Sequence, residues 1–248
     1  KTMFTICIHI AFSSSCDDTQ MPESPAPFPE ALTELPLFPL GTVLFPGALL
    51  PLQLFELRYL QMIGECERQG SGFGVVTLTQ GREVHRPGEA AEQFEPIGTR
   101  VQIERIERPQ PGLVMVWCRG VEKFRIEATQ QRSDGLWLGR VQALPPEPTV
   151  PVPEDLQHLS VQMHEALTQL SAQPSVVPPW NEAWRLQDCS WLSHRWGELL
   201  PLPLQMKYRL FALQEPLMRL ELLGDLVAPV GPSAKNPTGS GQKPPANS

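Results

Sequence analysis

Proline is concentrated in clusters along the chain, and these clusters limit where helices and strands can form. The chain has 28 prolines among 248 residues, about twice the usual share. Because proline interrupts helices and sheet ladders, each cluster should mark a tail or a boundary between elements. The clusters fall at residues 22–51, 145–153, 174–179, 201–203 and 229–245.

Residues 35–150 carry a β pattern. Short apolar runs bounded by Gly and Pro predict strands at 35–38, 49–55, 73–79, 98–106, 113–119, 123–128 and 136–144. One helix is predicted at 57–69, where apolar residues recur at helical spacing before Gly70, and Gly120 predicts a bulge. Trp117 lies in a run that is apolar on both faces, so we expect it to be buried. These elements predict a small β-barrel or a folded-over sheet of about six or seven strands.

Residues 151–228 have helical patterns instead. Apolar stripes predict helices near 156–170, 184–199, 204–213 and 216–226, with Asp188 or Ser190 as a cap. The fold class is therefore α+β, a β subdomain followed by a helical subdomain. We expect residues 1–34 to be a flexible tail, with 1–20 a tag or upstream translation, and 229–248 to be a disordered tail.

Charge and hydropathy argue against two classes of partner. The net charge is −7, and Lys and Arg are scattered singly, so a phosphate-binding face is not expected and nucleic acid is an unlikely partner. No apolar run approaches the roughly 18 residues of a membrane-spanning helix. We therefore expect no membrane association.

The cysteines and histidines offer no metal or cofactor site. The five cysteines form no C-x-x-C pair, and their odd number favours reduced thiols in a cytoplasmic protein. His158 and His164 are six residues apart, which does not place both on one metal from a single helix. We expect neither a metal nor a cofactor.

Three groups of short motifs occur in order along the chain. The first comprises L-P-L-F-P-L-G at 35–41, V-L-F-P-G at 43–47, L-P-L at 50–52 and F-E-L-R-Y at 55–59. The second comprises Gly72–Gly74, Gly98–Thr99, Gly120 and F-R-I at 124–126. The third comprises L-P-L at 200–202, Lys207, Leu210 and Arg219–Leu220. Together they resemble the N-terminal substrate-binding domain of Lon proteases, and most closely its stand-alone bacterial versions, with Leu57 where that family usually has proline.

The resemblance implies a PUA-like β fold followed by a helical bundle, and a module that binds polypeptide. The chain has no Gly-x4-Gly-Lys-Ser/Thr phosphate loop, and neither Lys123 nor Lys207 lies in a nucleophile motif. We therefore expect no ATPase, no peptidase and no catalytic residue.

Apolar residues beside Pro/Gly turns are the candidate binding surface. Phe38, Phe45 and Leu49 flank such turns, and Pro51 interrupts a strand, as on a sheet edge. This segment is either a peptide-binding edge or core filling.

The nearby polar residues Glu56, Arg58, Tyr59 and Arg125 are either a polar rim of that groove or structural ties. The tryptophans Trp180, Trp184, Trp191 and Trp196 are either core or an adhesive patch.

The leading functional hypothesis is a non-enzymatic module that binds unfolded or apolar polypeptide segments, with a protease or chaperone as a further class of partner. Two alternatives remain at this point, an RNA-binding protein of PUA-like fold and a small-ligand-binding regulatory protein.

Overall fold

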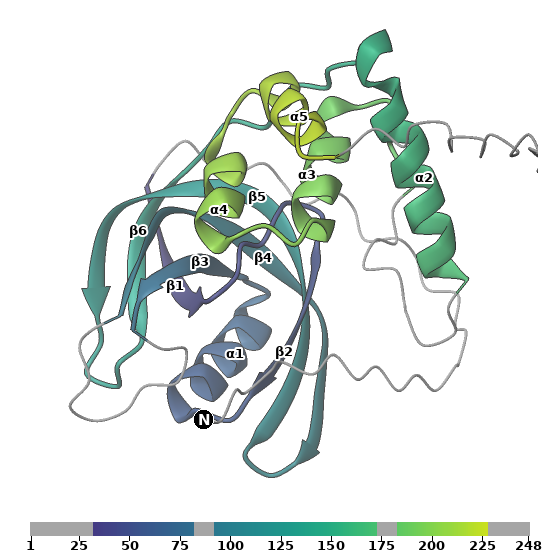
Figure 1. Ribbon diagram of the computed structural model, residues 1–248. Helices are drawn as coiled ribbons and strands as arrows, with labels where there is room; N and C mark the ends of the chain where they lie inside the picture. Colours follow the sequence, from purple (N-terminus) through teal and green to yellow (C-terminus); the bar gives the residue numbers. More distant parts are fainter. Residues whose placement is uncertain (1–31, 82–91, 173–182, 228–248) are drawn as a thin grey trace, which may run out of the picture.

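The computed structural model describes residues 32–81, 92–172 and 183–227 (Figure 1). Most of the predicted loop at 81–92 lies outside the described residues. So do Trp180 and the two predicted tails, apart from residues 32–34. The elements, in chain order, are β1 (Thr33–Leu40), β2 (Leu49–Leu54), α1 (Leu57–Gln69), β3 (Phe73–Gln80), β4 (Gln93–Gln110), β5 (Leu113–Gln131), β6 (Trp137–Ala143), the 3-10 turn η1 (Glu154–Leu156), α2 (Gln157–Ser171), α3 (Cys189–Leu199), α4 (Leu204–Ala212) and α5 (Pro216–Gly224).

The described strands form one six-stranded sheet in the order β2-β5-β4-β3-β1-β6. β1 and β3 are parallel, while all other neighbours are antiparallel. β6 also pairs with the C-terminal half of β5, which folds the sheet over on itself. β2 pairs with β5 alone, so its other edge has no partner strand among the described residues, and the sheet as a whole is folded over and not a closed barrel.

The strands predicted at 113–119 and 123–128 are a single strand, β5, that continues through Gly120. The register of β4 against β5 shifts here, because Val101 pairs with Gly120 and Arg100 with Glu122, leaving Val121 as the extra residue of a bulge. Glycine is required at position 120, since a Cβ there would lie 2.6 Å from the carbonyl oxygen of Phe45. The bulge was thus predicted correctly, but it bends one strand instead of separating two.

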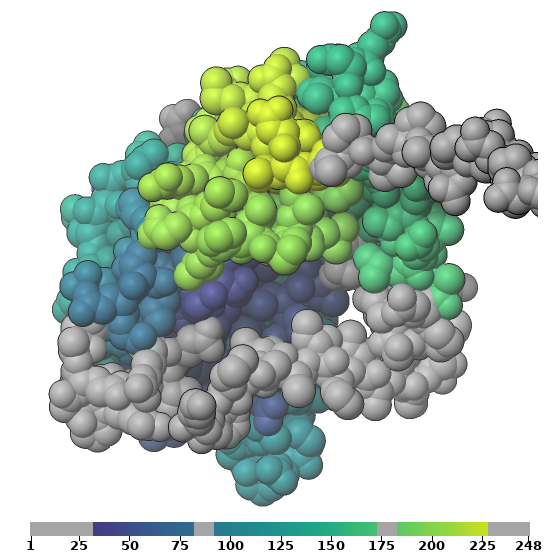
Figure 2. Space-filling model, in the orientation of Figure 1, coloured from purple at the N-terminus to yellow at the C-terminus, as the bar shows by residue number. Residues whose placement is uncertain are grey.

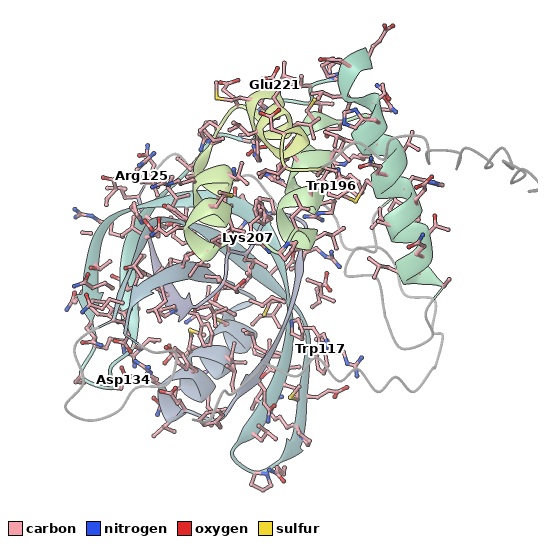
Figure 3. All side chains as sticks on the ribbon, viewed as in Figure 1. Trp117, Arg125, Asp134, Trp196, Lys207 and Glu221 are labelled. Carbon is pink, nitrogen blue, oxygen red and sulfur yellow. The ribbon has the colours of Figure 1, made fainter. Side chains whose placement is uncertain are left out.

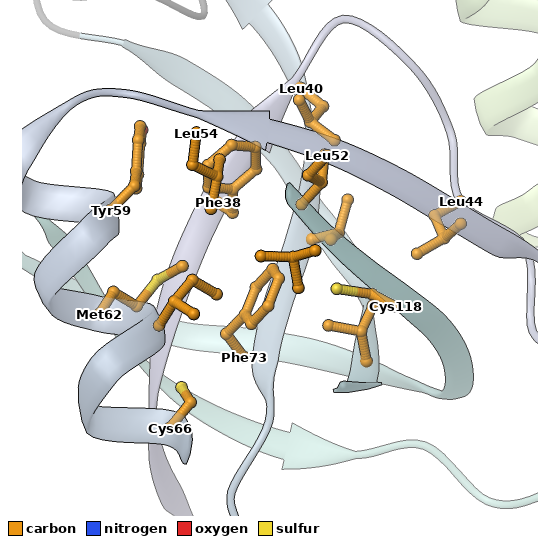
Figure 4. Close-up of a cluster of buried hydrophobic side chains, with 14 of the residues drawn as sticks. Phe38, Leu40, Leu44, Leu52, Leu54, Tyr59, Met62, Cys66, Phe73 and Cys118 are labelled. Carbon is orange, nitrogen blue, oxygen red and sulfur yellow. The ribbon is translucent and has the colours of Figure 1, made fainter. Parts of the chain in front are cut away.

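The main core lies between α1 and the inner face of the sheet (Figure 4). α1 begins and ends where its periodicity predicts, and Gly70 closes it with a left-handed φ of 62°. Its buried face includes Tyr59, Met62 and Ile63, which pack against Phe38 and Phe73 of β1 and β3. Alternate residues of β2 and β5 complete this core, namely Leu52, Leu54, Val116 and Cys118.

Helices α2 to α5 enclose a second core, and α3 and α4 lie over the upper end of the sheet in Figure 1 (Figure 2). Asp188 caps α3 by accepting a hydrogen bond from the amide of Ser190, and Pro216 begins α5, as their positions predict. Trp191 and Trp196 are buried in this core, and Trp184 packs against it. The three described tryptophans of this cluster therefore contribute to the core.

The loop between β1 and β2 joins the two cores. Phe45, fully buried, contacts His194 and Phe211 with ring centroids 5.6 Å away in each case. Gly197 of α3 allows this approach, because a Cβ there would lie 2.6 Å from the Phe45 ring. The F-P-G motif at 45–47 thus anchors the helices on the sheet.

Several predicted boundaries differ from those of the elements. β4 runs from Gln93 to Gln110 where a strand at 98–106 was predicted, and α3 begins at Cys189, later than the predicted start at 184. Thr33 and Glu34, which we assigned to the N-terminal tail, begin β1 and pair with β6. Within the described residues no helix is long and apolar enough to cross a membrane.

Candidate functional site

The free edge of β2 presents unpaired backbone groups. Ala48 accepts a hydrogen bond from the Gly120 amide at 2.9 Å, so its carbonyl points toward β5. Since backbone groups alternate in direction along a strand, those of Leu49, Pro51 and Gln53 point away from β5. Leu49 and Gln53 therefore offer donors and acceptors at the edge, while Pro51 offers only its carbonyl, as expected for proline on an edge strand.

The outer face of the sheet beside this edge carries apolar side chains. Phe55, on the same face as Pro51 and immediately after β2, is 58% exposed. Leu57, at the start of α1, is 69% exposed. On β5, Met115 and Trp117 lie opposite Gln53 and Pro51 and are partly exposed. We call the six residues Leu49, Pro51, Phe55, Leu57, Met115 and Trp117 the β2 edge surface.

Trp117 is partly exposed, contrary to our expectation of a buried residue. Its neighbours Val116 and Cys118 face the core, so alternation along β5 turns Trp117 outward. The Arg105 guanidinium lies over the indole, 4.5 Å from the ring centroid. Figure 3 shows Trp117 at the side of the sheet, away from helices α3 to α5. The apolar residues on both faces of this part of β5 therefore mark an exposed apolar patch on its outer face, and not a strand buried on both sides.

Phe38 and Phe45, two of the predicted binding residues, are buried and do not reach the surface. Phe38 packs on Tyr59 in the main core, with ring centroids 4.3 Å apart, and Phe45 fills the junction with the helices. Phe38 lies within β1 on the face covered by α1, and Phe45, in the loop after β1, packs against α3 and α4. The expectation that they form an exposed edge is therefore wrong. Of the four predicted binding residues, only Leu49 and Pro51 lie on the β2 edge.

The polar residues at the start of α1 make structural contacts. Arg58 is buried and donates to Glu56 at 3.0 Å, to Glu92 at 3.2 Å and to the Gly135 carbonyl at 2.8 Å. These bonds hold the start of α1 against the β5–β6 turn. Tyr59 is buried beside them, with the Arg58 guanidinium 4.6 Å from its ring centroid.

Arg125 does not join this group. It is exposed on β5 opposite Ile97, near the helices, whereas Trp117 lies on a distant part of the same strand (Figure 3). The structure thus separates Arg125 from the β2 edge surface.

A buried ionic cluster around Glu147 is the other concentration of polar groups. Glu147 accepts from Lys123 at 2.5 Å, from Ser190 at 2.7 Å and from Arg219, whose nearest nitrogen lies 2.7 Å away. His194 lies 3.4 Å from the same carboxylate. Desolvation raises the pKa of Glu147, but His194, Lys123 and Arg219 outweigh it and hold that pKa well below its usual range.

The Lys123 amine donates hydrogen bonds to three acceptors among the described residues. Besides Glu147, it donates to the carbonyls of Phe211 at 2.6 Å and Leu213 at 3.2 Å. Burial lowers the pKa of Lys123 to about 8, with Arg219 acting in the same direction. A lysine held this way is a structural tie between β5 and the α4–α5 connection, not an exposed nucleophile.

Surface hollows in the described part of the chain include one beside α1 and one between helices. The first, of about 590 Å³, is lined largely by charged side chains, including Glu65, Glu67 and Arg132. The other, of about 300 Å³, lies between α2 and the end of α3 and includes Leu170, Trp196 and Leu199. Both are open, and neither combines an enclosed apolar pocket with convergent polar groups, as small-ligand sites do.

The comparison with family models decides the relationship. The model of the ATP-dependent protease La (LON) substrate-binding domain matches residues 34–228. The chain belongs to this family. A LON substrate-binding domain is a substrate-recognition module and not a catalytic one. Among curated proteins no significant match was found.

Solved structures agree with the assignment. The crystal structure of a Lon N-terminal domain protein from Xanthomonas campestris is 30% identical, with a TM-score of 0.61, and the match covers 78% of this chain and 98% of that one. The N-terminal domain of Mycobacterium avium complex Lon protease shares the fold, with 19% identity, a TM-score of 0.51, and coverage of 78% of this chain and 97% of that one. The resemblance read from the sequence motifs is thereby confirmed.

Sequence reasoning missed Phe55 and Leu57 as surface residues of this LON substrate-binding domain. Both lie in the F-E-L-R-Y motif, and the signal that could have found them is period-two alternation. If Leu52 and Leu54 face the core, Phe55 must face outward. Leu57 also stands where the family usually has proline, at a helix start where a side chain is exposed.

Proposed function

We propose that this LON substrate-binding domain binds extended, apolar segments of unfolded polypeptide along the β2 edge. The observation that carries the proposal is the free edge of β2 next to exposed Phe55 and Leu57. An added strand pairs with the outward backbone groups of Leu49, Pro51 and Gln53. Its alternate side chains contact Phe55 and Trp117 on the outer face.

The proposed contact is weak and largely apolar. Pro51 removes one donor from the middle of the edge, so the added strand forms fewer hydrogen bonds than a regular neighbour. An unfolded ligand also loses conformational entropy on ordering, and we expect a Kd of roughly micromolar or weaker. Salt should change the affinity little, because the contact is between apolar groups and neutral backbone.

In this proposal the module binds the segment and does not itself unfold or cleave it. RNA, the ligand that a PUA-like fold suggests, is disfavoured by the arginines on the β4–β5 face. Arg100 pairs with Glu122 at 2.6 Å, and Arg119 pairs with Glu104. Arginines already neutralised by carboxylates offer little attraction to phosphates.

The test is fluorescence anisotropy with a labelled, reduced and alkylated protein that stays unfolded. Phe55→Asp should weaken binding at least tenfold while the melting temperature stays within a few degrees, since Phe55 is exposed. Val161→Asp is the matched control, because Val161 is 59% exposed on α2, away from the β2 edge surface. The control should bind as the parent chain does.

Equal binding by the parent chain and Phe55→Asp would contradict the proposed surface. Binding that is seen only with RNA and that disappears at high salt would replace the polypeptide hypothesis with the RNA-binding alternative.

A further inference from the structure

Helix α5 presents a second apolar surface, remote in sequence from the β2 edge. One face of α5 is buried, with Arg219, Leu220 and Leu223 fully inside. On the other face Met218, Leu222 and Leu226 recur every four residues and are 50%, 45% and 45% exposed. This spacing places the three side chains in one stripe along the helix and the turn that follows it.

All charged side chains exposed on α5 and its flanks are acidic. Glu215, Glu221 and Asp225 are exposed, and Glu221 extends outward from the top of the helical subdomain in Figure 3. Exposed Glu154 and Asp155 of η1 add to them, because η1 contacts α5. None of these five acids forms an ion pair within the described residues. The basic residue of α5, Arg219, is buried against Glu147 at 2.7 Å.

We infer that this surface, Met218, Leu222 and Leu226 rimmed by Glu215, Glu221, Asp225, Glu154 and Asp155, binds a basic amphipathic helix of a partner protein. Apolar residues of the partner at i, i+4 spacing pack on the stripe, and its Lys or Arg side chains meet the acidic rim. Unpaired acids around an apolar stripe attract such a partner and favour it over neutral or acidic ones.

Two other occupants are disfavoured by the same charges. In a two-fold dimer through this face, the acidic rims of two copies of the chain would oppose each other. A membrane with anionic lipids would be repelled in the same way. The surface also differs from the β2 edge in chemistry, since the β2 edge offers free strand hydrogen bonds and lacks a one-sign rim.

The test uses the full chain and two synthetic peptides with identical leucines at helical spacing, one carrying lysines on its polar face and the other glutamates. Fluorescence anisotropy should detect binding of the lysine peptide, at least tenfold tighter than that of the glutamate peptide. Leu222→Ser should weaken it about tenfold, and high salt should weaken it as well. Val161→Ser, an exposed apolar position on α2, and Phe55→Asp on the β2 edge should bind as the parent chain does.

A second variant, Glu221→Lys with Asp225→Lys, reverses charges on the rim. It tests the inference even if Leu222→Ser loses affinity because it misfolds. It should lose most of its preference for the lysine peptide, because the five rim charges change from −5 to −1, while retaining its melting temperature. Equal affinity for both peptides in the parent chain, loss of binding in Phe55→Asp, or an unchanged preference after charge reversal would overturn the inference. So would binding that is seen only after Lys235 and Lys243 are replaced by Gln, because the chain's own C-terminal segment would then be the occupant.

Discussion

Phe45 shows how one side chain can connect two cores. It extends from the loop between β1 and β2, contacts His194 and Phe211, and fits against α3 only because residue 197 is glycine. Phe55, ten residues later, has the same side chain in the opposite environment, since it is 58% exposed on the outer face. Phe45 therefore contributes to the stability of the fold, whereas Phe55 contributes an apolar side chain to the surface.

Phe45→Ala should lower the free energy of unfolding by about 3–5 kcal/mol, as for other buried Phe truncations. Phe55→Ala should change it by roughly 0.5 kcal/mol or less, because an exposed side chain has few contacts to lose. Urea denaturation of both variants checks this. Similar losses in the two variants would contradict the assignment of Phe45 to the junction.

His194 should make stability depend on pH. Burial lowers the pKa of His194 to about 3, with Arg219 and Lys123 acting in the same direction and Glu147 opposing. The unfolded chain binds this proton below about pH 6.5, whereas the folded chain does not until about pH 3. Stability should therefore fall as the pH is lowered from about 6.5 toward 3, by at most about 1.4 kcal/mol per pH unit from this group.

Urea denaturation at several pH values compares the parent chain with His194→Gln. The variant should be less stable at neutral pH, and the difference in the free energy of unfolding between the two chains should narrow as the pH falls. Exposed His158→Gln serves as the control and should leave the pH profile unchanged. A gap between the parent chain and His194→Gln that stays constant from neutral pH to about pH 4 would contradict the burial of a neutral His194.

The elements themselves could largely be predicted from periodicity. α1 was predicted at its observed limits, because Leu60 and Ile63 recur at helical spacing and Gly70 stops the helix. β5 could not be predicted as one strand, because a bulge and a break look alike when Gly120 interrupts an apolar run. The free edge of β2 could be anticipated from Pro51, but not which side chains lie beside it, since that depends on the register with β5.

Two helical glycines test how tightly the elements pack. A Cβ at Gly197 of α3 would lie 2.6 Å from the Phe45 ring, whereas nothing lies within 4 Å of one at Gly64 of α1. Gly197→Ala should therefore destabilise the fold by about 1–3 kcal/mol through overpacking. Gly64→Ala should stabilise it by up to about 1 kcal/mol, since alanine favours a helix. The melting temperatures of the two variants test this. A Gly197→Ala variant that is more stable than the parent chain would show that α3 does not pack against Phe45 in the loop between β1 and β2.

At the scale of the whole molecule, the Glu147 cluster joins the sheet to the helices. Its members come from β5, the connection after β6, α3 and α5, and so lie far apart in sequence. No spacing rule relates Lys123, His194 and Arg219, and their pairing could not be predicted without the fold. The family could be recognised, because its motifs occur in order. Alternation along β2 could place Phe55 at the surface, but that Met115 and Trp117 lie beside it depends on the register of β2 with β5.

The central claim is that the β2 edge accepts an added strand, and amide hydrogen exchange tests it most directly. The amides of Leu49 and Gln53 point away from β5, so they should exchange rapidly in the free chain. Adding the reduced and alkylated protein at saturating concentration should slow both at least several-fold, while the amide of Leu52, which points to β5, changes little. Unchanged exchange at Leu49 and Gln53 in the saturated complex would contradict strand addition at this edge.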